Sequence, residues 1–146
     1  MKSKNYILFG LRFCTLLFSL RVAGQFIQMN FPVDFLPPKE AWQGSTTPYP
    51  LLLSFQIIII FLFIYGQKRI ASGNLPKNAS VGKLCLGIGS IYLIAMVVRL
   101  FIGILDLIPD LWFHKPISSI FHMVIATYIL LLSRYHLNRH DESSSP

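Results

Sequence analysis

The chain has 146 residues, of which 53% are hydrophobic and only 13% charged, and its formal net charge is +7. A small soluble domain needs more charge on its surface, so this composition excludes that class and indicates a protein that spans a lipid bilayer. The basic residues are spread along the chain instead of forming one patch, which excludes nucleic acid as the expected partner.

Four apolar windows approach the roughly 20 residues that a transmembrane helix needs. They cover about residues 6–24, 51–65, 84–105 and 117–135. We therefore predict an all-α integral membrane protein whose single domain, residues 1–140, is an up-down bundle of four transmembrane helices. The short connections between the last three spans favour antiparallel neighbours. Residues 141–146 should form a disordered tail.

Lysine and arginine are distributed unevenly between the two sides of this bundle. One side carries eight of them: Lys2, Lys4, Lys68, Arg69, Lys77, Lys83, Arg134 and Arg139. The opposite loops carry only Lys39 and Lys115. The positive-inside rule then places both termini in the cytoplasm of a multi-pass protein of the cell membrane. Arg12 interrupts the first apolar stretch, which argues against a cleaved signal peptide.

The predicted external loop, residues 25–50, is rich in proline and aromatic residues. Proline discourages a helix here. Two interpretations stay open: an interfacial segment at the level of the lipid head groups, or an ordered lid over the mouth of the bundle.

Each span contains one long polar residue in its external half. In chain order these residues are Arg21, Gln56, Arg99 and His122. With a rise of 1.5 Å per residue, each lies roughly 6–9 Å below the external boundary. Polar side chains are unfavourable inside a bilayer, so a single layer of them predicts either a functional site or contacts between helices.

Helical periodicity turns Arg21, Arg99 and His122 toward the other helices, because each belongs to a stripe of small and polar residues. The stripes include Gly10, Cys14, Gln25 and Gln28 in the first span, Cys85, Tyr92 and Gly103 in the third, and Ser118, Ala126 and Ser133 in the fourth. Arg12 falls on the face opposite Arg21, so we expect it at the surface.

Two guanidinium groups and an imidazole favour an anionic ligand, such as a carboxylate or a phosphate head group. The first hypothesis is a non-enzymatic subunit or carrier that binds a lipid-like anion or a partner protein through Arg21, Gln56, Arg99 and His122. The alternative is an enzyme acting on a lipid or isoprenoid substrate, with His122 as acid or base, Asp106 orienting it, and the arginines clamping the anion. Purely structural contacts among these side chains would leave no cavity between them.

No cofactor or metal is expected. The chain lacks HExxH and the phosphate-binding motif GxxxxGK[ST]. Haem ligation within one protomer needs a histidine from each of two helices, whereas His122 and His136 fall in the same span. Cys14 and Cys85 form no CxxC motif and are interpreted as small apolar residues.

The expected partners are membrane lipids, another membrane protein or a second copy of the chain. In topology the chain is similar to several groups of small four-helix bacterial membrane proteins, including DoxX-like proteins. That similarity covers topology only, because no family motif is matched residue by residue.

Overall fold

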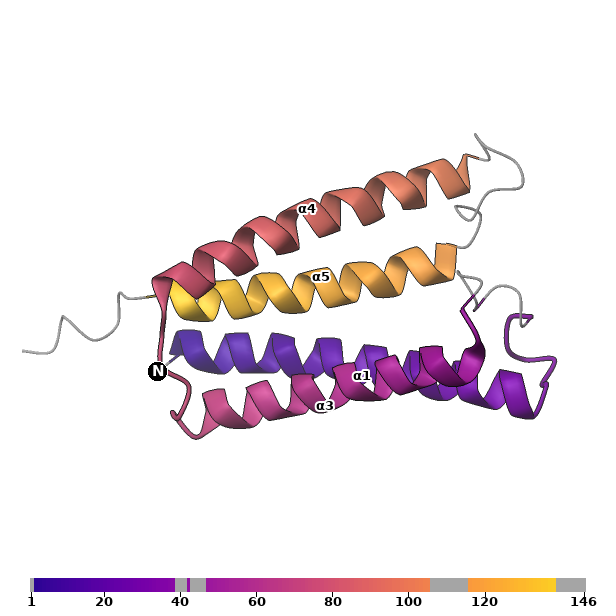
Figure 1. Cartoon of the computed structure of the whole chain (residues 1–146), viewed down its shortest axis with the longest axis horizontal. Helices are drawn as coiled ribbons and strands as arrows, with labels where there is room; N and C mark the ends of the chain where they lie inside the picture. The colour runs from indigo at the N-terminus through magenta and orange to yellow at the C-terminus, as the bar shows by residue number, and fades with distance from the viewer. Residues whose placement is uncertain (1, 39–41, 43–46, 106–115, 139–146) are drawn as a thin grey trace, which may run out of the picture.

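A computed structural model describes residues 2–38, 42, 47–105 and 116–138. These residues form four long α-helices: α1 (Lys2–Asn30), α3 (Tyr49–Ala71), α4 (Ala79–Ile104) and α5 (Pro116–Leu137). Each is long and apolar enough to cross a membrane. Consecutive helices run in opposite directions (Figure 1). The prediction of four apolar helices is therefore confirmed. The tail at 141–146 lies outside the described residues.

The helices are longer than the apolar windows of the sequence. α1 continues to Asn30 although its apolar window ends near residue 24, and α3 continues to Ala71 although its window ends near residue 65. Polar side chains end an apolar window without ending a helix. In α3, for example, Gln67 lies beyond the window and its Nε2 donates to the Leu11 carbonyl of α1 at 3.3 Å.

The connection between α3 and α4, residues 72–78, is a tight polar turn. Gly73 has a φ of +74°, a conformation that glycine adopts without a steric penalty. Asn78 caps α4, since its side-chain oxygen accepts from the backbone N–H groups of Ser80 and Val81 at 2.9 and 3.2 Å. The sequence Asn78-Ala79-Ser80 therefore begins a helix.

The helices do not pack in the order in which they follow one another along the chain. The main contacts join α4 to α5, α5 to α1 and α1 to α3, so α3 and α4 lie at opposite edges (Figure 1). Within the described part of the chain, α3 and α4 make no extensive contact although they are consecutive. The prediction that these consecutive helices are neighbours was wrong. The connection at 72–78 carries the chain past α5 and α1, and buried side chains decide which helices meet.

The most tightly packed part of the molecule is the half in which α1 begins and α5 ends. Its apolar core comprises Ile7, Leu8, Leu11, Cys14, Phe63, Ile70, Tyr128 and Tyr135. Tyr128 of α5 stacks on Phe63 of α3 with ring centroids 3.6 Å apart, and its hydroxyl donates to the Phe63 carbonyl at 2.9 Å. The Asn138 amide donates to Ser3 Oγ at 2.8 Å, which joins the beginning of α1 to the end of α5.

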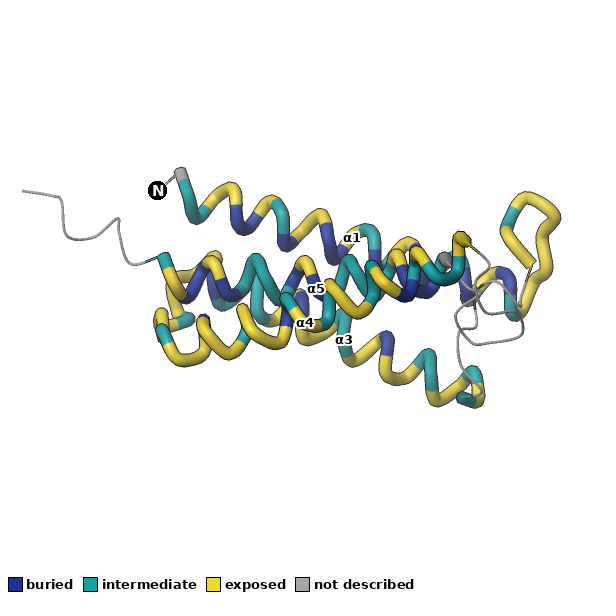
Figure 2. The backbone as a smooth tube through the Cα atoms, turned by 90° about the horizontal axis from the view of Figure 1, so that it is seen from above, coloured by how far each residue is buried: buried dark blue, intermediate teal, exposed yellow. Residues whose placement is uncertain are grey.

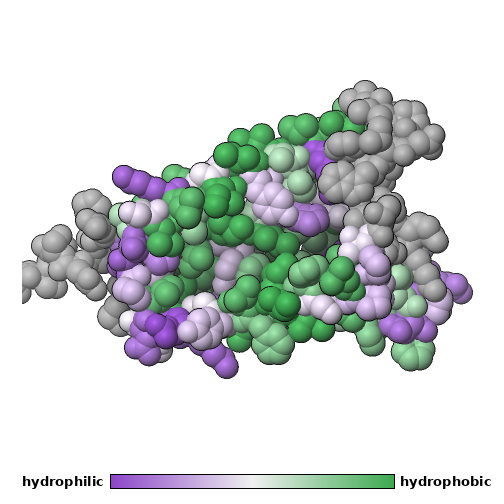
Figure 3. All heavy atoms as spheres, viewed as in Figure 1, coloured by the Kyte–Doolittle hydropathy of each residue, from purple (hydrophilic) through white to green (hydrophobic). Residues whose placement is uncertain are grey.

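Most of the apolar residues of α3 and α4 are on the outside of the molecule. Figure 2 shows buried positions recurring along α1, whereas exposed positions dominate α3 and α4. On the face drawn in Figure 3, apolar side chains cover the middle of the helices and hydrophilic ones gather toward their ends. Such a surface suits contact with lipid chains.

Two glycines of α4 allow its close approach to α5. A Cβ atom on Gly89 would lie 2.9 Å from Leu130 Cδ2, and one on Gly82 would lie 2.8 Å from Leu137 Cγ. The Ser133 hydroxyl also donates to the Gly82 carbonyl at 2.7 Å. Gly87, in contrast, has open space around the same position.

We expect the Gly89→Val variant to be less stable than the wild type by about 1–3 kcal/mol, because the new side chain overpacks the α4–α5 contact. The measurement is thermal unfolding in detergent, followed by circular dichroism. Gly87→Val is the matched control, since it makes the same change in the same helix without a facing neighbour. Equal unfolding midpoints for the two variants would contradict this account of the contact.

Candidate functional site

A cavity of about 330 Å³ lies between the helices in the half where α1 ends and α3 and α5 begin. Its lining residues are Phe18 and Arg21 of α1, Leu52, Phe55, Gln56 and Ile59 of α3, Arg99 of α4, and Ser118, Phe121, His122 and Ile125 of α5. The α3 and α5 sets are each spaced as i, i+3, i+4 and i+7, so each is one continuous helix face. On the face drawn in Figure 3, the surface is hollowed between α4 and α3.

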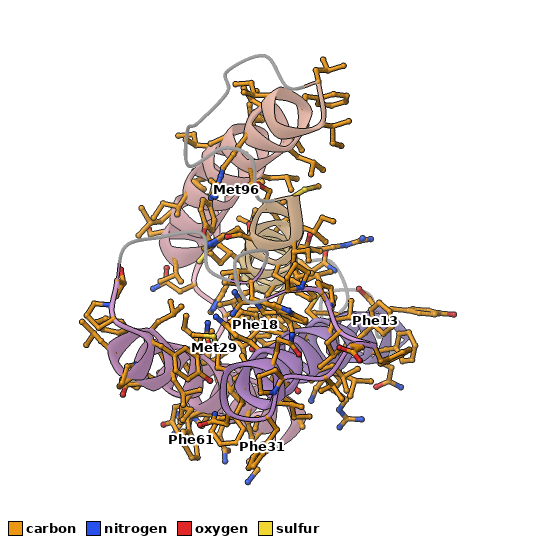
Figure 4. All side chains as sticks on the ribbon, turned by 90° about the vertical axis from the view of Figure 1, so that its right-hand side faces the viewer. Phe13, Phe18, Met29, Phe31, Phe61 and Met96 are labelled. Atoms are coloured by element: carbon orange, nitrogen blue, oxygen red, sulfur yellow. The ribbon has the colours of Figure 1, made fainter. Side chains whose placement is uncertain are left out.

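Inward and outward faces are clearly separated on α1 and α3. In the end view of Figure 4, Phe18 lies in the centre of the molecule, whereas Phe13 and Phe61 point outward. Phe18 is 3% exposed and packs against Phe63 with ring centroids 6.0 Å apart. The apolar wall of the cavity is therefore continuous with the closed core of the other half.

All four polar residues singled out in the sequence line this one cavity, each from a different helix. Arg21, Gln56 and Arg99 are buried, and His122 is partly buried. The structure thus brings the four side chains together, as their shared depth and helical phase predicted, and their role in binding stays a prediction. Asp106, the acid proposed to orient His122, lies outside the described residues.

Arg21 is held in the cavity by neutral groups. Its Nη2 donates to the Trp42 carbonyl at 3.3 Å, and its guanidinium carbon lies 5.8 Å from the centre of the Phe121 ring. In the described part of the chain, its Nε has no hydrogen-bond partner. None of the four helices contains an aspartate or glutamate. The helices therefore provide no carboxylate to balance this positive charge.

Trp42 fixes one point of the connection between α1 and α3 against α1. Its ring packs so closely on Gly24 that a Cβ there would lie 3.0 Å from Trp42 Cη2. Its indole N–H donates to the Pro37 carbonyl at 2.8 Å. Phe31 and Phe35, nearer α1 along the chain, are exposed. The loop thus contacts α1 at Trp42, while residues 39–41 and 43–46 lie outside the described part, so both interpretations of the loop stay predictions.

Gln56 is positioned by Gln25 of α1, which is completely buried. Gln56 Nε2 donates to Gln25 Oε1 at 3.0 Å. This single bond leaves Gln56 Oε1 and Gln25 Nε2 without a partner among the described residues. Each of these two buried amide groups can therefore form one further hydrogen bond, Gln56 Oε1 as the acceptor and Gln25 Nε2 as the donor.

His122 forms a hydrogen-bonded pair with Tyr92 of α4. The Tyr92 hydroxyl lies 2.5 Å from His122 Nδ1, and the two rings meet edge to face. Either the phenol donates to an unprotonated Nδ1 or a protonated Nδ1 donates to the phenol oxygen. The pair joins α4 to α5 beside the cavity and holds the imidazole in one orientation.

Helical phase identified two of these supporting residues without assigning them a role. Gln25 lies one turn after Arg21, and Tyr92 lies two turns before Arg99, so each shares a face with its arginine. The contact between Arg21 and Trp42 had no such signal. A backbone carbonyl has the same chemistry in every residue, so no residue type marks it as an acceptor.

The described residues offer no metal site. Within residues 2–38, 42, 47–105 and 116–138, no three histidine, cysteine or acidic side chains come together as ligands. Cys14 and Cys85 are both free thiols, one buried and one partly buried. The polar groups of the cavity are mainly nitrogen donors, which suit an anion better than a cation.

Comparisons of the chain with models of protein families, with curated proteins and with solved structures found no match. The similarity in topology to DoxX-like proteins therefore assigns the chain to no family. Its function must be argued from the chemistry of the cavity.

Proposed function

We propose that the protein is a multi-pass protein of the cell membrane, with four transmembrane helices and both termini in the cytoplasm. Four helices of sufficient length and hydropathy support this proposal. The orientation is supported by the lysine and arginine residues near both chain ends and on either side of the α3–α4 connection, where Lys68, Arg69, Lys77 and Lys83 lie. The exposed apolar faces of α3 and α4 then contact lipid, a partner protein or a second copy of the chain.

Cysteine labelling tests this orientation. In a background with Cys14→Ala and Cys85→Ala, a membrane-impermeant maleimide should label the Val33→Cys variant in intact cells. It should label Asn74→Cys only after the membrane is opened, because that turn faces the cytoplasm. The reverse pattern would show that the orientation is wrong.

We further propose that the cavity binds the anionic group of a lipid-like molecule, and that the protein is a non-enzymatic subunit or carrier. The observation that carries this proposal is Arg21. Its positive charge lies at a cavity of about 330 Å³ and, among the described residues, contacts a carbonyl and an aromatic ring. A guanidinium presents several N–H donors in a plane, which matches a phosphate or carboxylate group.

The bonding of the polar residues favours a binding site over purely structural contacts. Arg21, Gln56 and His122 bond to Trp42, Gln25 and Tyr92, not to one another. Each of these three side chains is thus oriented by a residue that does not line the cavity, and the cavity remains between the three. Side chains that only joined the helices would use one another as partners and fill that space.

The Arg21→Gln variant should bind phosphatidylglycerol at least about tenfold more weakly than the wild type, because a charged hydrogen bond is replaced by a neutral one. Binding is measured by native mass spectrometry of protein in a neutral detergent with added lipid. Arg12→Gln is the matched control: it removes the same charge from an exposed position of the same helix. If both variants bound the lipid equally weakly, or if both bound it as the wild type does, lipid binding would not depend on the arginine in the cavity.

A second candidate is an enzyme that acts on a lipid or isoprenoid substrate. The Tyr92–His122 pair favours it, since an imidazole held at 2.5 Å from a phenol can exchange protons with a bound substrate. In that case Tyr92→Phe and His122→Gln should abolish conversion of a radiolabelled membrane lipid while lipid retention persists. The control compares the lipid composition of membranes that contain the wild-type protein with that of membranes that lack it. The same composition in both would exclude an enzyme.

A further inference from the structure

Among the described residues, the packing order of the helices leaves the cavity without a helical wall on one side. The cavity is lined from α3 and from α5, yet α3 packs mainly on α1, and α4 packs mainly on α5. In the described residues no extensive contact closes the space between α3 and α4. Figure 1 shows α4 diverging from α5 toward the end of α4, which is the half of the molecule in which the cavity lies.

Phe55 marks the mouth of the cavity on this side. It lines the cavity and is nevertheless 54% exposed, so its ring forms part of both the cavity wall and the outer surface of α3. Ile58, three residues further along α3, is 52% exposed and does not line the cavity. The outer surface beside the mouth is therefore as apolar as the wall within it.

The two ends of the cavity differ in chemistry. Arg21 and Gln56 provide charge and hydrogen bonds, whereas Ile59 and Ile125 lie one turn nearer the closed core and are purely apolar. A molecule that satisfies both ends carries an anionic group and a hydrocarbon chain side by side. At about 330 Å³ the cavity holds a head group and the beginning of a chain, and the rest of a long chain must pass out through the open side.

We infer that the ligand is an anionic phospholipid, and that it reaches the cavity sideways from the bilayer through the gap between α3 and α4. This inference rests on the proposed binding of an anion by Arg21. The phosphate contacts the Arg21 guanidinium and the Gln56 amide, and an acyl chain lies along Phe55, Ile59 and Ile125. The amides of Gln25 and Gln56 can both rotate without losing their mutual bond, so Gln56 can present an oxygen or an NH₂ group.

A small water-soluble anion with the same phosphate chemistry is disfavoured by the apolar wall. Such an ion loses its hydration on entering the cavity and gains little from Phe55, Ile59 or Ile125. A lipid is already in the bilayer, so its acyl chain passes from one apolar environment to another, and each CH₂ group that enters the cavity adds van der Waals contacts that a soluble anion cannot make. Affinity should therefore increase with the length of the acyl chain.

The test compares three ligands on the wild-type protein in a neutral detergent by native mass spectrometry. Long-chain phosphatidylglycerol should be retained, and dihexanoyl phosphatidylglycerol should be retained at least about tenfold more weakly. Glycerol phosphate, even in large molar excess, should not displace the long-chain lipid. Phosphatidylcholine of the same chain length, whose head group has no net charge, should not be retained.

A pair of tryptophan variants tests where the acyl chain of the lipid lies. Ile59→Trp fills the apolar end of the cavity and should lower retention of the long-chain lipid at least about tenfold. Ile58→Trp is the matched control, because it places the same side chain on the outer surface of α3 and should retain the lipid as the wild type does. The ligand comparison decides the question even where Ile59→Trp fails to fold, since it needs no variant.

Each outcome separates this inference from the proposed function. Displacement by glycerol phosphate at equal affinity, or equal retention by Ile59→Trp and Ile58→Trp, would overturn the lateral route and leave anion binding in place. Wild-type retention by Arg21→Gln, or equal retention of phosphatidylcholine, would overturn anion binding itself.

Discussion

A guanidinium buried among apolar helices is the constraint on which the half of the molecule that contains the cavity depends. On insertion scales, an arginine at the centre of a transmembrane helix is unfavourable by about 3 kcal/mol. Arg21 contacts the Trp42 carbonyl and the Phe121 ring, which stabilise the charge without neutralising it. The four helices contain no acidic residue that could balance the charge of Arg21. The charge accounts for the hydrogen bond to the Trp42 carbonyl, and it is the basis of the proposal that the cavity binds an anion.

The closed half of the molecule gives this site a rigid base. Tyr128 joins α5 to α3 through a stacked ring and a hydrogen bond, and Ser133 joins α5 to α4 through the Gly82 carbonyl. These contacts hold the helices together where α1 begins, while α4 diverges from α5 toward the other end (Figure 1). A binding site is more precisely formed when its residues project from packed helices than when they lie on loops. Here the four polar side chains all project from helices, and only Trp42 comes from a connection.

The supporting residues have a common role. Gln25, Tyr92 and Trp42 each bond to one residue of the cavity and restrict its orientation. Such bonds are formed before any ligand arrives, so less conformational entropy is lost on binding. The gap between α3 and α4 complements this arrangement, because on the proposed lateral route it leaves the oriented groups accessible from the bilayer. A rigid polar wall opposite an open apolar side suits a ligand that is itself polar at one end.

The sequence by itself determined the four helices and the level of their polar residues, because hydropathy and the 3.6-residue period are local properties. Counting residues along each span placed Arg21, Gln56, Arg99 and His122 at one depth, and the structure puts all four around one cavity. The ends of α1 and α3 were underestimated, since polar residues end an apolar window without ending a helix. Only the tertiary structure decided that α3 and α4 are separated, because a connection of this length fits several packing orders and helix surfaces rich in leucine and isoleucine resemble one another. It alone supplied the partner of Arg21 as well, since the Trp42 carbonyl is a backbone group that no residue type in the sequence marks.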